Sequence, residues 1–143
     1  MFKRVLVPIE TKEKSENAIN LAFTIGDTHK AEIILFHVIN AKKLDLSASL
    51  TQIEREEKRK ILEEDVFKML FSIKKDAPGE RMKVFIDIVE GEPASKICEV
   101  ATKNKVDLII MPKTGKIGVR RVLVGDISIK VLECTDIPVM LVV

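Results

Sequence analysis

The feature of this sequence that most constrains its fold is a set of five short apolar segments rich in branched side chains. Polar residues hardly interrupt these segments, a pattern typical of strands that are buried on both faces of a parallel sheet. The predicted strands are Lys3 to Ile9, Ala31 to Val38, Lys83 to Val89, Asp107 to Met111 and Pro138 to Val143. We therefore expect helices on both faces of one sheet.

Between these strands the apolar residues recur at helical spacing, and Ser15 is the expected cap of the first helix. The intervening segments are a helix after Ser15, a polar connection from Asn40 to Ser47 with a helix from Ser49 to Lys75, a helix opened by Gly91-Glu-Pro-Ala, and a loop from Pro112 to Val124 with a helix from Asp126. This alternation predicts an open parallel α/β sheet with right-handed crossovers, in one domain spanning residues 1–143.

Composition excludes several classes of function. The chain has 24 Lys and Arg against 22 Asp and Glu, a net charge of +2, and neither Trp nor Tyr. Such a balance gives no general attraction to nucleic acid or to anionic lipid, so we expect neither partner. No apolar run reaches about 18 residues, and the first apolar run is too short for a signal peptide. We therefore expect a cytoplasmic protein.

The chemistry-bearing residues form no catalytic or metal-binding constellation. Cys98 and Cys134 lack both a Cys-x-x-Cys spacing and a nearby His, so we expect two small core side chains without a disulfide or a zinc site. No Ser, His and Asp arrangement and no pair of acids appears, so we assign no catalytic residue and expect no robust catalysis. His37 is expected to be a hydrogen-bonded core residue.

A ligand site in a sheet of this kind lies beyond the carboxyl ends of the strands, where the strand order reverses. The segment from Pro8 to Thr11 follows the first predicted strand, and the segment from Met111 to Gly118 follows the fourth. The second segment is basic and leads to a helix start after Gly125, where free N–H groups favour anions. We therefore consider a small anion as a ligand.

The order and spacing of several short motifs resemble the universal stress protein family over nearly all 143 residues. The motifs are Val-Leu-Val-Pro at 5 to 8, Leu-Phe-His-Val at 35 to 38, Gly91-Glu-Pro, Asp107-Leu-Ile-Ile-Met111, Leu123-Val-Gly125 and Ile137-Pro-Val-Met-Leu-Val-Val143. The resemblance implies a Rossmann-like domain with strand order 3-2-1-4-5 that is often homodimeric. It also implies ATP binding in one branch of the family and none evident in another. The same resemblance would place His37, near the end of the second strand, close to an adenosine pocket.

The ATP-binding branch carries Gly-x2-Gly-x9-Gly followed by Ser or Thr, and this chain matches it only in part. Gly115 and Gly125 match the second and third glycines, whereas Pro112 replaces the first glycine and Asp126 the hydroxyl residue. Pro112 has no N–H, and the Asp126 carboxylate repels phosphate. Asp126 is either a helix cap that replaces the ligand anion, which we favour, or a Mg²⁺ ligand. Glu10 stands where the family usually has Asp.

Two functional hypotheses follow from this resemblance. The first is a dimeric, non-catalytic stress-response module with a degraded ATP motif, acting through protein contacts or an unidentified small ligand. The second is an ATP or AMP switch, or a slow ATPase, that uses Mg²⁺ and the loop after the fourth strand. If the pocket works, its expected residues are Pro8, Glu10, Val38, Met111, Lys113, Gly115, Gly125 and Asp126.

The last apolar segment points to self-association. The implied strand order places it at an edge of the sheet, and an exposed apolar edge can pair with another chain. The resemblance implies that two such strands meet across a two-fold axis. We therefore expect a homodimer whose interface comprises either Val139, Leu141 and Val143 or Pro138, Met140 and Val142.

Overall fold

The computed structural model describes residues 1–45, 51–113 and 126–143, with the side chain of residue 126 excluded. Helices and strands alternate along this part of the chain, as the apolar pattern predicts. The elements are β1 (Arg4–Pro8), α1 (Lys12–His29), β2 (Glu32–Asn40), α2 (Ala41–Asp45), α3 (Gln52–Lys75), β3 (Val84–Gly91), α4 (Pro93–Lys103), β4 (Leu108–Pro112), α5 (Asp126–Cys134) and β5 (Val139–Val142).

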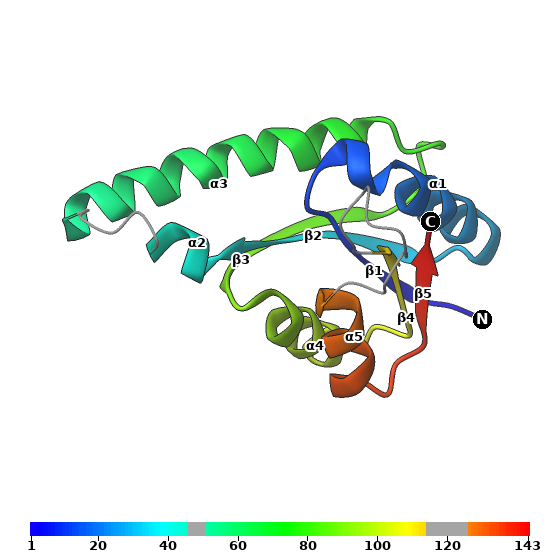
Figure 1. The fold of residues 1–143 in the computed structure, drawn as a ribbon. Helices are drawn as coiled ribbons and strands as arrows, with labels where there is room; N and C mark the ends of the chain where they lie inside the picture. Colours follow the sequence, from blue (N-terminus) through cyan, green and yellow to red (C-terminus); the bar gives the residue numbers. More distant parts are fainter. Residues whose placement is uncertain (46–50, 114–125) are drawn as a thin grey trace.

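The strands form one sheet in the order β3-β2-β1-β4-β5, and every neighbouring pair is parallel. Figure 1 shows α1 and α3 on one face of this sheet and α4 and α5 on the other. The predicted fold class and strand order are therefore confirmed.

Each face of the sheet has its own apolar core. Val5, Val7 and Leu35 point toward α1 and α3, where Leu70 and Ile73 of α3 are buried against them. The intervening strand residues, such as Leu6 and Phe36, point toward α4 and α5. Alternation along the strands explains why these segments have no polar face.

Part of the sheet extends beyond the body as an arm. β1 pairs with β2 only as far as the Pro8–Phe36 pair, whereas β2 and β3 stay paired to Asn40 and Gly91. We call this two-stranded extension, together with α2 and the N-terminal half of α3, the arm; Figure 1 shows it projecting to the left.

Three local predictions were wrong. Thr11, rather than Ser15, caps α1, because its Oγ1 accepts a hydrogen bond from the Lys14 amide while Ser15 is buried in the first turns of the helix. The connection predicted from Asn40 to Ser47 contains the short helix α2. Asn40 precedes this helix, and its Oδ1 accepts a hydrogen bond from the Lys42 N–H.

The third wrong prediction concerns the cysteines. Cys98 of α4 and Cys134 of α5 form a disulfide, although 36 residues separate them in sequence. Helices α4 and α5 pack side by side on the same face, which brings the two Cα atoms to 6.2 Å, within the range that a disulfide spans. Cys98 still belongs to the core, as expected, with 8% of its surface exposed.

Candidate functional site

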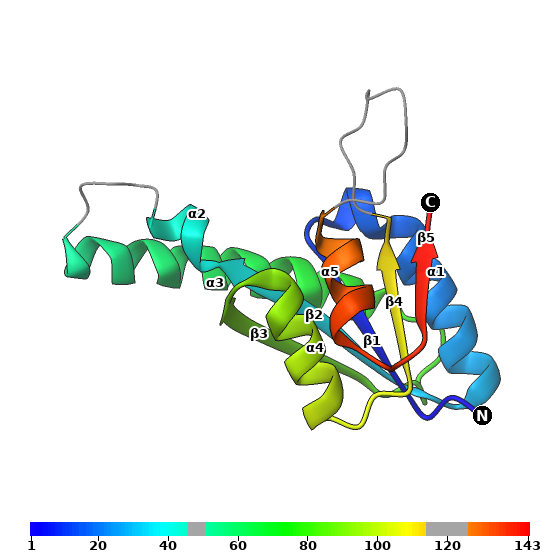
Figure 2. The same ribbon diagram turned by 60° about the horizontal axis from the view of Figure 1, so that its bottom comes forward.

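The topology places the candidate site at the carboxyl ends of β1 and β4. The chain leaves β1 through α1 on one face, whereas it reaches β4 through α4 on the opposite face. Neighbouring strands whose connections diverge in this way leave a crevice between their carboxyl ends, where ligands of such folds bind. Figure 2 shows β1 and β4 running in the same direction toward this edge.

Five of the predicted pocket residues come from strand ends at this edge. Pro8 pairs with Phe36, and the register of β1 with β4 places Pro8 level with Met111. Val38 lies two residues beyond Phe36, and Lys113 directly follows β4. Glu10 follows β1 by two residues.

The remaining predicted residues lie between β4 and the first residue of α5, which is Asp126. Gly115 and Gly125 lie outside the described residues. Asp126 is the first residue of α5, but its side chain lies outside the description, so the capping and Mg²⁺ interpretations both stay predictions.

The main chain of Val38 lies in the part of β2 that extends beyond its pairing with β1. The Phe36 carbonyl accepts the Ile9 N–H at 2.7 Å, so the main chain of Phe36 faces β1. Because main-chain groups two residues apart point the same way, the N–H and C=O of Val38 face the same side. The described pairing of β2 with β1 ends at Phe36. The N–H of Val38, a donor, and its C=O, an acceptor, therefore face the crevice.

His37 binds the chain just beyond the last paired residue of β1. Its Nδ1 lies 2.7 Å from the Ile9 carbonyl oxygen, which the Val38 N–H would otherwise reach in a continued ladder. A carbonyl only accepts, so Nδ1 is the donor. The expectation of a hydrogen-bonded His37 is confirmed. No sequence pattern could have predicted that this bond uses the carbonyl oxygen of Ile9.

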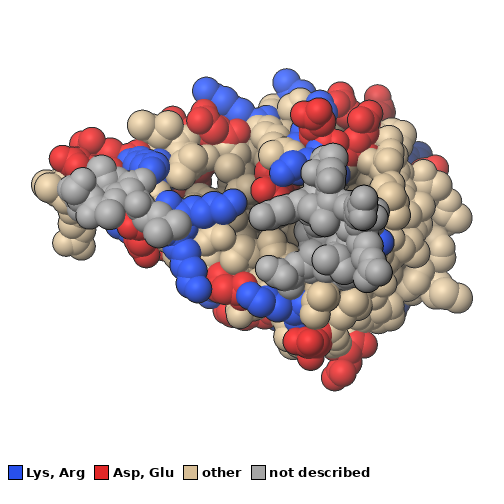
Figure 3. Space-filling view, in the orientation of Figure 1, with Lys and Arg blue, Asp and Glu red and all other residues tan. Residues whose placement is uncertain are grey.

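The charges near this edge favour a small anion over a dense metal site. Glu10 pairs with Lys14 at 3.8 Å, and both side chains are more than half exposed. Lys113 is anchored through its N–H, which donates to the Val142 carbonyl at 2.8 Å. Figure 3 shows Lys and Arg side chains bordering a hollow between the arm and the body. Among the described residues, no group of His, Cys, Asp and Glu could hold a metal ion.

Two grooves of the described surface lie away from this edge. One, of about 420 Å³, runs beside α3 and β3 and includes Lys60, Glu64 and Phe67. The other, of about 470 Å³, lies between α1 and α3 and includes Lys12 and Asp76. Neither groove contains a predicted pocket residue. Within the described ranges, no helix combines the length and apolar character needed to cross a bilayer.

The family model, a curated relative and a solved structure that match this chain are all of one protein family. A family model described as the universal stress protein family matches residues 1–143. The universal stress protein MJ0577 of Methanocaldococcus jannaschii is 30% identical over 99% of this chain and 95% of its own. Its solved structure superposes with a TM-score of 0.82 at 32% identity, covering 99% of this chain and 96% of that one.

Two more distant structures share the fold and hold nucleotides. A universal stress protein in complex with cAMP has a TM-score of 0.71 at 18% identity, covering 99% of this chain and 96% of its own. A universal stress protein of Archaeoglobus fulgidus in complex with dAMP has a TM-score of 0.63 at 13% identity, covering 98% and 97%.

Proposed function

This chain belongs to the universal stress protein family, and from that premise we propose that it is a non-catalytic, dimeric stress-response module. We propose further that its crevice binds an adenosine monophosphate in preference to ATP. Residues 1–143 would act as one domain in this role.

The observation that carries this proposal is the pair of main-chain groups that Val38 presents to the crevice. An N–H beside a C=O complements the Watson–Crick edge of adenine, where N1 accepts and the N6 amino group donates. Two proteins of the same fold are known in complex with cAMP and with dAMP. Adenine monophosphates therefore fit both the chemistry of the crevice and the ligands of its relatives.

The phosphate side of the crevice is the part that departs from the ATP motif. Pro112 ends β4 and offers no N–H to a phosphate oxygen. Asp126 opens α5, where its carboxylate would compete with a triphosphate for the N–H groups of the helix start. A single phosphate beside Lys113 demands less of this region than three, which supports AMP over ATP.

Calorimetric titration of the purified protein with AMP, IMP and ATP, with and without Mg²⁺, tests the proposal. IMP carries N1–H and O6, which reverses the donor and acceptor pattern of adenine. We expect AMP to bind at least about tenfold more tightly than IMP and ATP. Equal affinity for AMP and IMP would contradict recognition by Val38.

A matched pair of variants isolates the main-chain donor. Val38→Pro removes the N–H that faces the crevice, whereas Val38→Ala keeps it and shortens a side chain packed on the α4 face. We expect AMP affinity to fall at least tenfold more in the proline variant. Circular dichroism controls for folding of both proteins.

The second candidate function, an ATP switch or slow ATPase, is supported by the partial motif at Gly115 and Gly125. It predicts that ATP binds as tightly as AMP and is hydrolysed with Mg²⁺. Under our proposal, Pro112→Gly with Asp126→Ser raises ATP affinity and leaves AMP affinity unchanged. No nucleotide binding at all would favour a module that acts only through protein contacts.

The dimer proposal rests on β5, an edge strand of the sheet that pairs only with β4. Its side chains are half-buried, with Met140 and Val142 on one core and Val139 and Leu141 on the other. The unpaired main-chain edge is therefore the surface offered to a second copy. Leu141→Lys should reduce the mass found by light scattering from two chains to one, and an unchanged mass would contradict the interface.

A further inference from the structure

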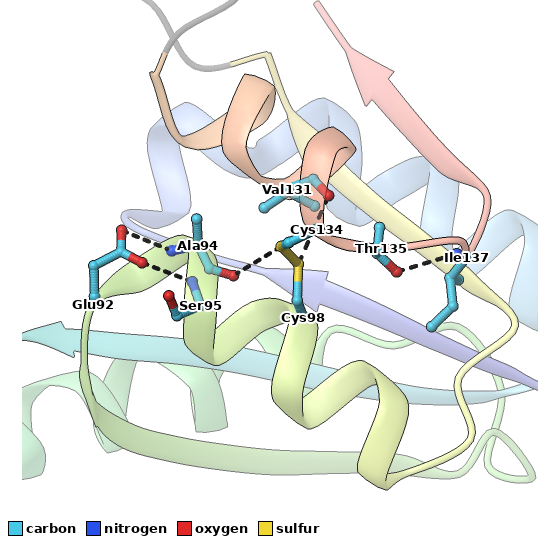
Figure 4. The surroundings of a disulfide bond; sticks show 8 residues. All are labelled: Glu92, Ala94, Ser95, Cys98, Val131, Cys134, Thr135 and Ile137. Atoms are coloured by element: carbon cyan, nitrogen blue, oxygen red, sulfur yellow. Dashed lines mark hydrogen bonds between the residues drawn. A yellow bond between two sulfur atoms is a disulfide. The ribbon is translucent and has the colours of Figure 1, made fainter.

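The disulfide between α4 and α5 joins two sulfur atoms in different surroundings (Figure 4). Cys98 is buried, and its Sγ lies 3.7 Å from the Val131 carbonyl oxygen beneath α5. Cys134 is the last residue of α5 and is exposed, with its Sγ 3.8 Å from the Ala94 carbonyl oxygen. Cys134 is therefore the more accessible of the two cysteines.

The bond joins a short helix to α4. α5 has nine residues, fewer than an isolated helix needs to be stable in water. Val131 and Ser128 are buried beneath it, whereas Ile129 and Leu132 are 43% and 48% exposed. Its C-terminal end continues into a turn in which Thr135 Oγ1 accepts the Ile137 N–H (Figure 4). Cys134 thus ties the C-terminal end of α5 to α4.

We propose that the Cys98–Cys134 pair is a site of reversible thiol–disulfide exchange with a dithiol reductant, which attacks at Cys134 and releases α5 from α4. The exposed Sγ of Cys134 accepts the incoming thiolate, and Cys98 leaves as a thiolate. The second thiol of the reductant then attacks the mixed disulfide and frees Cys134. The reductant loses two electrons and becomes a disulfide, and the protein ends with two thiols.

This assignment is independent of the nucleotide proposal, because it needs neither the crevice nor a bound ligand. Attack at the other sulfur would require α5 to leave first, since Val131 and its carbonyl cover Cys98. The packing therefore sets the order of events. Thiol–disulfide exchange at Cys134 precedes the release of α5, and the disulfide can form again only after α5 returns to α4.

The first test follows reduction of the native protein by dithiothreitol, with alkylation of the freed thiols and mass spectrometry. We expect reduction to be at least about tenfold faster than hydrogen exchange of the most protected sheet amides, which reports global unfolding. With glutathione as a single thiol, the trapped mixed disulfide should be on Cys134. Reduction only at the rate of global unfolding, or glutathione on Cys98, would overturn the proposal.

Thiol labelling of two single variants and hydrogen exchange in α5 test the proposal further. The thiol of Cys134 in Cys98→Ser should react with iodoacetamide at least about tenfold faster than the thiol of Cys98 in Cys134→Ser. Reduction of the wild-type protein should raise hydrogen exchange in α5 at least tenfold and leave β2 unchanged. Equal labelling rates, or unchanged exchange in α5, would contradict a release of this helix.

Discussion

Helices α3 and α5 lie on opposite faces of the same sheet, and they are held in place by different means. α3 has 24 residues, a complete capping box at Thr51 and Glu54, and two buried residues. Its Arg55 and Arg59 both pair with Glu90 of β3, at 3.2 and 3.1 Å. α5 has nine residues and a covalent bond to α4.

The difference shows that length decides how a helix is attached. A long helix distributes its attachment over caps, ion pairs and apolar contacts, so the loss of one leaves the others. The Arg55 guanidinium illustrates this redundancy, because hydrogen bonds to Asp45 and then Glu90 raise its pKa and keep α2, α3 and β3 together. Within the described residues, the short helix α5 buries Val131 and Ser128 and is joined to α4 by one covalent bond.

The largest expected effect tests whether the apolar contacts of α3 outweigh its polar ones. Leu70 is fully buried on the sheet side of α3, whereas Leu62 on the same helix is 37% exposed. Leu70→Ala should lower the free energy of unfolding by about 2–5 kcal/mol, since it leaves a cavity. The matched variant Leu62→Ala should cost well under half as much in urea titration. Similar losses at both positions would contradict an apolar anchor centred on Leu70.

Reduction of the disulfide should have the next largest effect. Because the bond closes a long loop of the unfolded chain, its loss should lower the free energy of unfolding by about 2–4 kcal/mol. Urea titrations with and without dithiothreitol measure this difference. Cys134→Ala is the control, and its stability should not respond to the reductant. If the wild-type protein is equally stable with and without dithiothreitol, the disulfide does not stabilise the attachment of α5, and the proposed difference between α3 and α5 is contradicted.

Loss of the capping box should cost about 1 kcal/mol. Thr51 Oγ1 accepts the Glu54 N–H at 3.2 Å, and Thr51→Ala removes this acceptor while Thr51→Ser keeps it. Because the ion pairs to Glu90 and the buried leucine remain, hydrogen exchange should rise only in the first turn of α3. Increased exchange along the whole helix would show that its attachments are less redundant than proposed.

The positions of the strands could be predicted because they follow from local patterns, whereas their order was implied by the family resemblance. Apolar runs fixed the strands, and the ends of those strands carried Pro8, Val38 and Met111 to one edge. What the sequence could not supply was contact between distant segments. The spacing of Cys98 and Cys134 has no diagnostic form, since the bond depends on how two helices pack.

Contacts between distant segments also explain why the sequence did not predict the role of the Val38 main chain or the Thr11 cap. The peptide groups of Val38 face the side on which β1 has already ended, and every side chain at position 38 would share them. Thr11 was missed as a cap because Ser15 also has a hydroxyl, and only the burial of Ser15 against the sheet separates the two. Burial of a small polar side chain is a tertiary property.

The smallest effect concerns whether α5 also has an electrostatic attachment to α4. Glu92 caps α4 by accepting the Ser95 N–H at 2.8 Å and the Ala94 N–H at 3.3 Å. These bonds, that from Ser95 above all, and the charge of Lys130 on α5 lower the pKa of Glu92, although burial acts in the opposite direction.

A lowered pKa stabilises the fold above the ordinary pKa of a glutamate, and this contribution is lost as the pH falls through the folded value. The wild type should therefore lose stability relative to Glu92→Gln between about pH 5 and about pH 3, as urea titrations across this range would show. Lys130→Gln should move that loss to slightly higher pH, since the carboxylate then lacks its cation. An unmoved profile would mean that only packing and the disulfide hold α5 on α4.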